Sequence, residues 1–457
     1  MLLDSTLREG ELYRQLSVEV KVRVAEALAE AGVRRVELTV DYPPRTRRKD
    51  VEQVVEALRS HPVQVIIHGR AYPRDVEAAA SYDVDGVGVY LAPTRIHREH
   101  KLGGIGYREA VERLKEAVEL AKSYGFRYRR ATVEDASRFY LEEGVERLSS
   151  LVEELGEAGA TLVSVPDTAG MLTPPLARIL FTELAERCRT PLAAHFHNDY
   201  GYASANTLEA ALAGAEELHV TILGIGDRNG IADLYEVAAA LADLHGLDLG
   251  VNRERLARLY REFSRLTGVK LFFRHPLSEE ARTIRAGVHQ SMVVRKPEGY
   301  IPSKKLHYDF EGAVFEATPF LSRKLVQMLL GDGADEEEVR KATETLAQEA
   351  YRRGGRLTVR RVREVLEAKG YRLREEALNR FFQHERAYIL LNLNPRYPVR
   401  RVLAELSGWD EVEQVDEVYG DVDLVIVARI KPGESIVEHL RRKFGRVIER
   451  MRILITD

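Results

Sequence analysis

The first half of the chain alternates short apolar runs with longer segments whose apolar residues recur at helical spacing. Residues 18–31 typify the longer segments, because Val20, Val24 and Leu28 would share one helix face. The short runs are rich in β-branched residues, as in buried strands. Eight of them occur, at residues 1–5, 34–40, 63–68, 86–91, 128–133, 162–165, 192–196 and 219–223.

This alternation predicts a closed (β/α)8 TIM barrel, because eight strand–helix units within roughly 250 residues fit that architecture. An open doubly wound sheet would show the same alternation. Such a sheet usually carries a glycine-rich phosphate loop after its first strand, whereas the segment here reads STLREGE. We therefore expect a barrel over residues 1–247.

The pattern changes after residue 247. Helical spacing recurs at residues 251–267, 320–330, 335–353, 358–369 and 374–385, and a proline-broken stretch lies at 271–305. The last part reads strand, helix, strand, strand, helix, strand, with Gly420-Asp421 as a hairpin turn. That order is ferredoxin-like. We predict a helical subdomain over 248–385 and a ferredoxin-like domain over 386–457.

Composition excludes several classes of protein. The chain has 457 residues and a net charge of −4, so it lacks the basic footprint of a nucleic-acid-binding protein. No apolar stretch reaches the ~18 residues that a membrane span needs. The single cysteine, Cys188, excludes an internal disulfide and a multi-thiolate metal site. We expect a cytoplasmic protein that binds neither nucleic acid nor membrane.

Polar side chains gather where the predicted strands end. In a TIM barrel the chemistry lies at the C-terminal ends of the strands. The candidates at these ends are Arg8, Glu9, Glu11, Glu37, His68, Glu134, Asp135, Asp167, Thr168, His195, His197, Asn198, Asp199 and Asp227. Such an accumulation of His, Glu and Arg predicts an active site at this end.

The segment His195-Phe196-His197 is the sharpest local signal. Alternation along a strand puts both imidazoles on one face, with α-carbons about 6–7 Å apart. Two imidazoles and a carboxylate suit a divalent metal, and Glu9 is the best-placed carboxylate. The alternative is that one histidine bonds within the core while the other faces solvent. With Asn198 and Asp199 following, we favour the metal.

Three motifs together carry a resemblance to a known family. DSTLREGE at 4–11, HFHND at 195–199 and LGIGDRNGI at 223–231 resemble the DRE-TIM metallolyase superfamily, most closely its homocitrate synthase branch. The resemblance extends to about residue 303. Glu9 and Ile231 match that branch rather than the 2-isopropylmalate and citramalate synthases, which usually carry Asp and Asn there.

The resemblance implies a divalent metal (Mg²⁺, Mn²⁺ or Zn²⁺) held by Glu9, His195 and His197. It implies condensation of acetyl-CoA with 2-oxoglutarate to homocitrate in lysine biosynthesis. The metal would act as a Lewis acid and a base would deprotonate the acetyl group. The implied substrate-binding residues are Arg8, His68, Arg130, Thr132 and Thr168. The implied catalytic residues are Arg8, Glu134, His289 and Tyr300, with the last two supplied by the partner in a homodimer.

Several assignments have structural alternatives. Glu37 could pair with an arginine inside the barrel, His68 could be structural, Asp167 could cap a helix, and Tyr300 could only pack. The sequence also departs from the homocitrate synthase pattern at four positions: Leu12 stands for Gln, Ala193 for Glu, Asp227 for Glu and Ile284 for His. The carboxylate missing at Ala193 is the one associated with lysine binding in the family's active site.

The C-terminal domain resembles the RAM (ACT-like) domains of leucine-responsive regulators, through YGDVDLVIVARI at 419–430. This resemblance implies an amino-acid effector, for which we expect lysine, bound near Gly420, Asp421 and Asp423. A plain dimerisation module is the alternative.

Other functions remain open at this stage. The chain could be a 2-isopropylmalate or citramalate synthase that uses another 2-oxo acid, or an inactive barrel retained as an amino-acid sensor. A hydroxymethylglutaryl-CoA lyase would need a cysteine near the end of the barrel, and Cys188 precedes the seventh strand.

Overall fold

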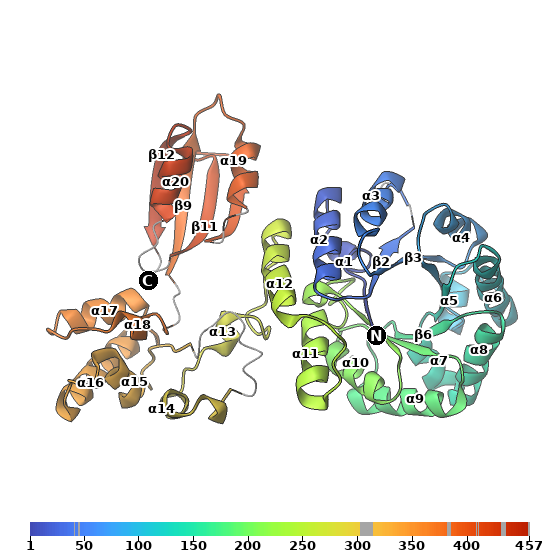
Figure 1. Cartoon of the computed structure of the whole chain (residues 1–457), viewed down its shortest axis with the longest axis horizontal. Helices are drawn as coiled ribbons and strands as arrows, with labels where there is room; N and C mark the ends of the chain where they lie inside the picture. The colour runs from blue at the N-terminus through green and yellow to red at the C-terminus, as the bar shows by residue number, and fades with distance from the viewer. Residues whose placement is uncertain are drawn as a thin grey trace. The chain divides into compact units, whose positions relative to one another are not determined.

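A computed structural model describes residues 1–40, 42–43, 46–301, 314–381, 385–407, 409, 411–430 and 436–455. Its contacts define two compact units, Met1–Tyr260 and Arg261–Asp457 (Figure 1). The first unit contains the predicted barrel. The second contains the helical region and the ferredoxin-like sheet, whose apolar cores are separate. The finer division at residue 385 therefore stays a prediction.

The first unit confirms the barrel. In the described residues, eight parallel strands close as β1 meets β8. They are β1 (Leu2–Asp4), β2 (Arg35–Thr39), β3 (Gln64–Arg70), β4 (Gly86–Leu91), β5 (Tyr128–Val133), β6 (Leu162–Asp167), β7 (Leu192–Phe196) and β8 (Glu217–Val220). The last strand was predicted at 219–223, which is wrong by two residues at its start. Residues Ile222–Gly224 form a 3-10 helix, η1, instead.

Helices surround the strands (Figure 1). Their apolar residues recur at helical spacing, so each buries one face against the sheet. They are α2 (Val18–Glu30), α3 (Arg48–Leu58), α4 (Pro73–Ala80), α6 (Tyr107–Ser123), α8 (Val145–Glu157), α9 (Pro174–Arg187), α10 (Ala203–Leu212) and α11 (Leu234–His245). Short helices α1 (Gly10–Tyr13), α5 (Arg95–His100) and α7 (Ala136–Glu143) lie in the loops that follow β1, β4 and β5. These loops lie at the C-terminal ends of the barrel strands.

Helix α12 (Arg253–Thr267) spans the boundary between the units. The second unit continues with α13 (Glu279–Arg282), α14 (Gly287–Arg295), η2 (Pro297–Gly299), α15 (Arg323–Leu330), α16 (Glu336–Arg352), α17 (Val359–Glu367) and α18 (Glu375–Leu378). Phe315, Leu325, Leu346 and Val362 are fully buried in its core. Asp335 and Glu338 form a capping box that starts α16, which satisfies otherwise unpaired backbone N–H groups.

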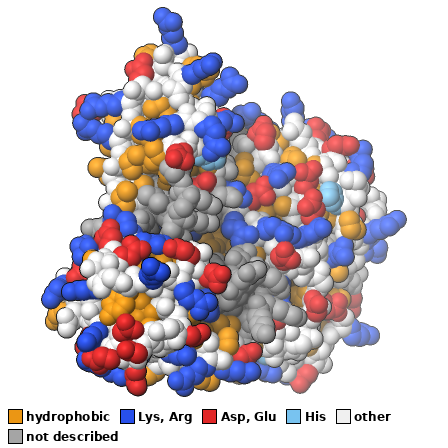
Figure 2. Space-filling view, turned by 60° about the vertical axis from the view of Figure 1, so that its left-hand side comes forward, with side chains coloured by type: hydrophobic (Ala, Val, Ile, Leu, Met, Phe, Trp, Pro, Cys, Tyr) orange, Lys and Arg blue, Asp and Glu red, His pale blue; other side chains and the backbone are white. Residues whose placement is uncertain are grey.

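The ferredoxin-like domain is confirmed. Strands β9 (Glu385–Leu393), β10 (Val412–Glu417), β11 (Leu424–Ile430) and β12 (Ile448–Ile455) form an antiparallel sheet in the order β10-β11-β9-β12. Helices α19 (Val399–Leu406) and α20 (Ile436–Phe444) bury Leu406 and Leu440 in its core. The surface of this unit carries apolar side chains among Lys and Arg (Figure 2), and Leu454 on β12 is 55% exposed.

None of the helices in the described part of the chain has the length and apolar character that a membrane crossing requires.

Candidate active site

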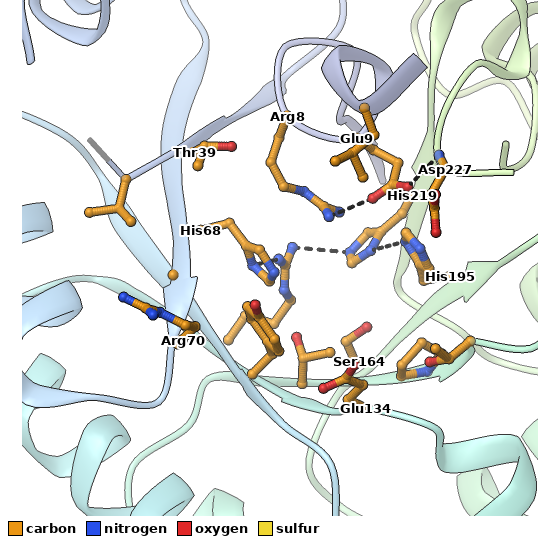
Figure 3. A pocket seen from close by; sticks show the side chains of 18 of the residues that line it. Arg8, Glu9, Thr39, His68, Arg70, Glu134, Ser164, His195, His219 and Asp227 are labelled. Atoms are coloured by element: carbon orange, nitrogen blue, oxygen red, sulfur yellow. Dashed lines mark hydrogen bonds and ion pairs between the residues drawn. The ribbon is translucent and has the colours of Figure 1, made fainter. Parts of the chain in front are cut away.

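A cavity of about 540 Å³ opens at the C-terminal ends of the barrel strands (Figure 3). It collects side chains that lie far apart in the sequence, because the closed sheet brings all strand ends to one rim. Its lining includes every barrel residue expected to bind metal, bind substrate or act in catalysis: Arg8, Glu9, His68, Arg130, Thr132, Glu134, Thr168, His195 and His197. The residues that the sequence analysis selected at the strand ends therefore form part of the cavity wall.

A buried carboxylate organises the cavity floor. Glu37 accepts hydrogen bonds from Ser5 Oγ and Arg8 Nε, both at 2.6 Å, and from Arg130 Nη2. Burial would raise the pKa of Glu37, but the guanidinium groups of Arg130 and Arg8 hold it well below the ordinary value. The alternative in which Glu37 pairs with an arginine is confirmed. This carboxylate fixes the orientation of both cationic side chains.

His68 presents a defined hydrogen-bond donor. Its Nδ1 lies 2.9 Å from Arg130 Nη2, and its ring stacks on Tyr90 with centroids 5.1 Å apart. Burial lowers the pKa of His68 well below the ordinary value, even with Glu37 nearby. Glu37 Oε1 lies farther from Nδ1, at 3.5 Å. Because arginine can only donate, the shorter Arg130 contact makes Nδ1 the acceptor and assigns the proton of the neutral ring to Nε2.

The expected metal ligands lie on one side of the cavity. The rings of His195 and His197 have centroids 5.2 Å apart, and both side chains are buried. Burial lowers the pKa of both rings, so they are neutral, as metal ligation requires. Among the described residues, His197 Nδ1 is a buried nitrogen with no hydrogen-bond partner.

The third expected ligand, Glu9, is engaged elsewhere. Its carboxylate accepts hydrogen bonds from Arg8 Nη1 at 2.6 Å and from the Asp227 backbone N–H at 3.1 Å. Within the described ranges, no group of three His, Cys, Asp or Glu side chains is arranged to hold a metal ion. The donor chemistry fits a divalent cation, because neutral imidazoles, one with an orphaned nitrogen, lie near a carboxylate. The set is not preassembled, so Glu9 would have to turn from Arg8.

Hydroxyl groups of β5, β6 and the loop after β6 also line the cavity. Thr132 Oγ1 and Ser164 Oγ are buried with no hydrogen-bond partner among the residues that the structure describes. Thr168 Oγ1 accepts from the Asp135 backbone N–H at 2.9 Å, so its own proton can be donated. Ser164 was missed by the sequence analysis, although the parallel register places it beside Thr132. Together these hydroxyls offer donors for a carboxylate.

The expected acid–base residues fall in two units. Glu134 accepts hydrogen bonds from Lys101 Nζ at 2.6 and 2.8 Å, and Lys101 is a cavity residue that the sequence analysis missed. His289 and Tyr300 belong to the second unit, where their rings stack with centroids 3.9 Å apart. The structure thus pairs these two rings, and their meeting with Glu134 stays a prediction.

A second buried carboxylate, also missed, lies on β8. Glu217 accepts hydrogen bonds from Tyr128 Oη at 2.7 Å and Arg35 Nη1 at 2.6 Å, and its Oε1 lies 2.9 Å from His219 Nε2. Burial would raise the pKa of Glu217, but His219, Arg130 and Arg35 hold it at about 2. His219 lines the cavity floor. The alternation of Glu217 and His219 along a strand was the signal that could have found them.

Two other acidic candidates organise loops. Asp167 accepts hydrogen bonds from the backbone N–H groups of Met171 and Leu172, each at 2.9 Å, so it shapes the loop after β6. Asp199 pairs with Arg228 at 2.8 and 2.9 Å, and Arg228 also donates to the Thr168 carbonyl oxygen. These bonds join the loops after β6, β7 and β8.

The expected effector residues lie in the hairpin between β10 and β11. Asp423 Oδ2 accepts from the Leu393 backbone N–H at 2.7 Å, and Asn392 donates to the Asp421 carbonyl oxygen at 2.8 Å. Asp423 therefore anchors the hairpin to β9, whereas Asp421 and Gly420 are exposed. Their part in effector binding stays a prediction.

The barrel also matches a known family. The HMGL-like family model covers residues 1–262, more than half of the chain. The chain belongs to the HMGL-like family. Its family region ends close to the unit boundary at Tyr260, so the barrel is the part that defines membership.

Relatives within the HMGL-like family carry different synthase names. A probable 2-isopropylmalate synthase of Methanopyrus kandleri is 37% identical over 306 residues, covering 66% of this chain and 59% of that protein. A homocitrate synthase of the same organism is 34% identical, covering 66% and 75%. An (R)-citramalate synthase of Methanocaldococcus jannaschii is 34% identical, covering 66% and 61%. Similarity therefore does not select one substrate.

The chain thus spans about three fifths of the length of the first of these relatives. Among solved structures, an HMG-CoA lyase of Bacillus subtilis superposes with a TM-score of 0.52 at 21% identity, covering 59% of this chain and 94% of that one. At this identity the likeness concerns the fold of the barrel.

Proposed function

We propose that this protein is a 2-oxo-acid acyltransferase that uses acetyl-CoA, specifically a homocitrate synthase that condenses acetyl-CoA with 2-oxoglutarate. The synthase names of its relatives support the reaction class. The polar cavity supports a small anionic substrate, because it combines Arg8 and Arg130 with hydroxyl groups that have no hydrogen-bond partner among the described residues. The active form would be a homodimer.

The residues fit a divalent cation, which His195, His197 and Glu9 would hold. When bound, the metal (Mg²⁺, Mn²⁺ or Zn²⁺) would supply a Lewis acid for the keto group. The burial of both histidines keeps them neutral and excludes competing protons.

The chain's own residues supply the remaining chemistry. Arg8, fixed by Glu37, would stabilise negative charge that develops on the keto oxygen. Thr132, Ser164 and Thr168 would orient the adjacent carboxylate. Glu134, paired with Lys101, would act with His289 and Tyr300 of a partner subunit to remove a proton from the acetyl methyl group.

The observation that carries the choice of 2-oxoglutarate is the 2.9 Å contact between His68 Nδ1 and Arg130 Nη2, which leaves Nε2–H of His68 as a donor. A second carboxylate on the substrate would find a hydrogen-bond donor and a nearby cation there. The branched apolar end of 2-oxoisovalerate would leave that donor unpaired at a cost of about 1–3 kcal/mol.

A thiol-release assay with 2-oxoglutarate, 2-oxoisovalerate and pyruvate tests this proposal. We expect the highest kcat/KM with 2-oxoglutarate. His68→Leu should lower that value by about tenfold to a hundredfold, because it removes a hydrogen bond to a charged group. His68→Gln, which keeps an N–H near the Nε2 position, should recover part of the loss. CoA release with 2-oxoisovalerate or pyruvate and none with 2-oxoglutarate would reassign the protein to a 2-isopropylmalate or citramalate synthase.

We also propose that the C-terminal domain is a RAM-like module that binds lysine beside the β10–β11 hairpin. The exposed Asp421 carboxylate supports a cationic amino acid as ligand. Lysine at a hundred times its Kd should stabilise the domain by about 2.7 kcal/mol, which raises its Tm. The fluorescence of Trp409, the single tryptophan, reports on this unit.

In the same measurement, Asp421→Asn should reduce the lysine-induced shift, whereas Glu417→Gln on the neighbouring strand should leave it intact. Leucine at the same concentration serves as the control ligand, because its side chain is uncharged. An equal shift in the wild type and in Asp421→Asn would remove Asp421 from the effector site.

A further inference from the structure

The cavity floor contains a histidine that the proposed reaction does not use. His219 on β8 is 2% exposed, and Figure 3 shows it beside His195. Its Nε2 lies 2.9 Å from Glu217 Oε1, and its Nδ1 lies 3.3 Å from His195 Nδ1. We propose that Glu217 and His219 form a positioning relay that fixes the tautomer of His195 and leaves His195 Nε2 unprotonated for the cation. This inference rests on the proposed metal role of His195.

The relay begins at the Glu217 carboxylate. Glu217 is fully buried and already accepts hydrogen bonds from Tyr128 and Arg35. An ionised carboxylate can only accept, so the nitrogen 2.9 Å from its Oε1 must carry a proton. An unprotonated nitrogen there would place two lone pairs against each other in a buried site. The contact therefore assigns the proton of neutral His219 to Nε2.

Arg130 Nη1 lies 3.2 Å from the same His219 nitrogen and would favour the opposite tautomer. The carboxylate contact is shorter and involves a full negative charge. Arg130 has other acceptors as well, because Nη2 donates to Glu37 and His68. The Glu217 bond thus decides where the proton lies.

The consequence appears at His195. With its proton on Nε2, His219 has a lone pair on Nδ1, and a hydrogen bond across the 3.3 Å contact requires a proton on His195 Nδ1. Neutral His195 then keeps its lone pair on Nε2. Supporting groups of this kind orient a metal-ligating histidine and fix its tautomer, and their loss typically lowers metal affinity by about tenfold to a hundredfold.

Two variants of nearly equal shape separate the relay from simple packing. His219→Leu fills the space without polar atoms. His219→Asn places an amide group near the position of Nδ1, where its oxygen can accept from His195. Mn²⁺ affinity, measured by electron paramagnetic resonance as loss of the free-ion signal, is the readout and requires no turnover. His100→Asn, at an exposed helix position, controls for loss of a histidine.

We expect His219→Leu to bind Mn²⁺ about tenfold to a hundredfold more weakly than the wild type. His219→Asn and His100→Asn should stay within a few fold of the wild type. If the wild type binds Mn²⁺ and both His219 variants bind equally well or weaken equally, the relay is wrong and the proposed metal site stands. If the wild type binds no divalent cation, both proposals fail.

Should His219→Leu not fold, the tautomers of the wild type decide the question. Long-range proton–nitrogen correlation spectra of protein labelled with ¹⁵N-histidine distinguish the two tautomers. The relay requires protonated Nε2 in His219 and protonated Nδ1 in His195, and the reverse assignment would overturn it.

Discussion

Replacing Arg8 with glutamine should lower kcat for CoA release by about a hundredfold to a thousandfold, the range typical for loss of one oriented group that stabilises an oxyanion. Arg8 lines the cavity and is bonded to Glu37 and Glu9, at 2.6 Å in each case. Its charge is therefore already oriented before substrate arrives and needs no reorganisation during the reaction. Turnover at saturating acetyl-CoA and 2-oxoglutarate is the measurement.

A second arginine of the same cavity wall provides the control. Arg70 also lines the cavity, but its guanidinium is held in a paired hydrogen bond by Asp75, at 2.9 Å for both Nε and Nη2. Arg70→Gln should change kcat little. Arg8→Lys should recover part of the loss, because it restores the positive charge but not the planar guanidinium group with its several oriented N–H donors. Equal losses in Arg8→Gln and Arg70→Gln would mean that general disturbance of the wall, and not charge at Arg8, lowers kcat.

The barrel could be predicted from the sequence because parallel strands covered by helices appear as continuous apolar runs. The prediction went wrong at β8. The predicted strand began at His219 and left out Glu217, because a pattern based on burial of apolar residues counts a charged position as surface. They lie inside because Arg35 on β2 and Tyr128 and Arg130 on β5 provide hydrogen-bond partners from other strands of the barrel. Those partners are distant in sequence, so periodicity within one segment cannot reveal them.

The same reasoning explains which site residues were found. The motifs at 4–11 and 195–199 begin in the last residues of β1 and β7, and a closed barrel necessarily brings strand ends together. Ser164 and Lys101 belong to none of the sequence motifs. The place of Ser164 in the cavity depends on the register between β5 and β6, and that of Lys101 depends on the course of the loop after β4. The engagement of Glu9 with Arg8 was also unpredictable, since opposite charges that are adjacent in sequence need not be in contact.

Replacing Arg130 with methionine should destabilise the barrel by about 3–5 kcal/mol, the usual cost of removing one partner of a buried ion pair. Arg130 is 1% exposed and contacts Glu37, His68, His219 and Tyr128. Without it, the buried Glu37 carboxylate keeps the Arg8 pairing but loses its strongest neutralising charge. Urea unfolding of the full chain, followed by circular dichroism, measures the loss. Trp409 fluorescence follows the second unit and should shift less.

The double variant Glu37→Gln/Arg130→Met separates loss of charge balance from loss of packing. It should be more stable than Arg130→Met alone, because no unbalanced carboxylate remains. The pH dependence has a definite sign. In the wild type the pKa of Glu37 is lower in the folded protein than in the unfolded chain, where it is 4.5. The ionised carboxylate therefore contributes folding stability above pH 4.5, and this contribution is lost as the pH falls through the folded-state pKa. The deficit of Arg130→Met should therefore be largest at neutral pH and smaller near pH 4. A deficit of equal size in the single and double variants at both pH values would assign the whole effect to packing.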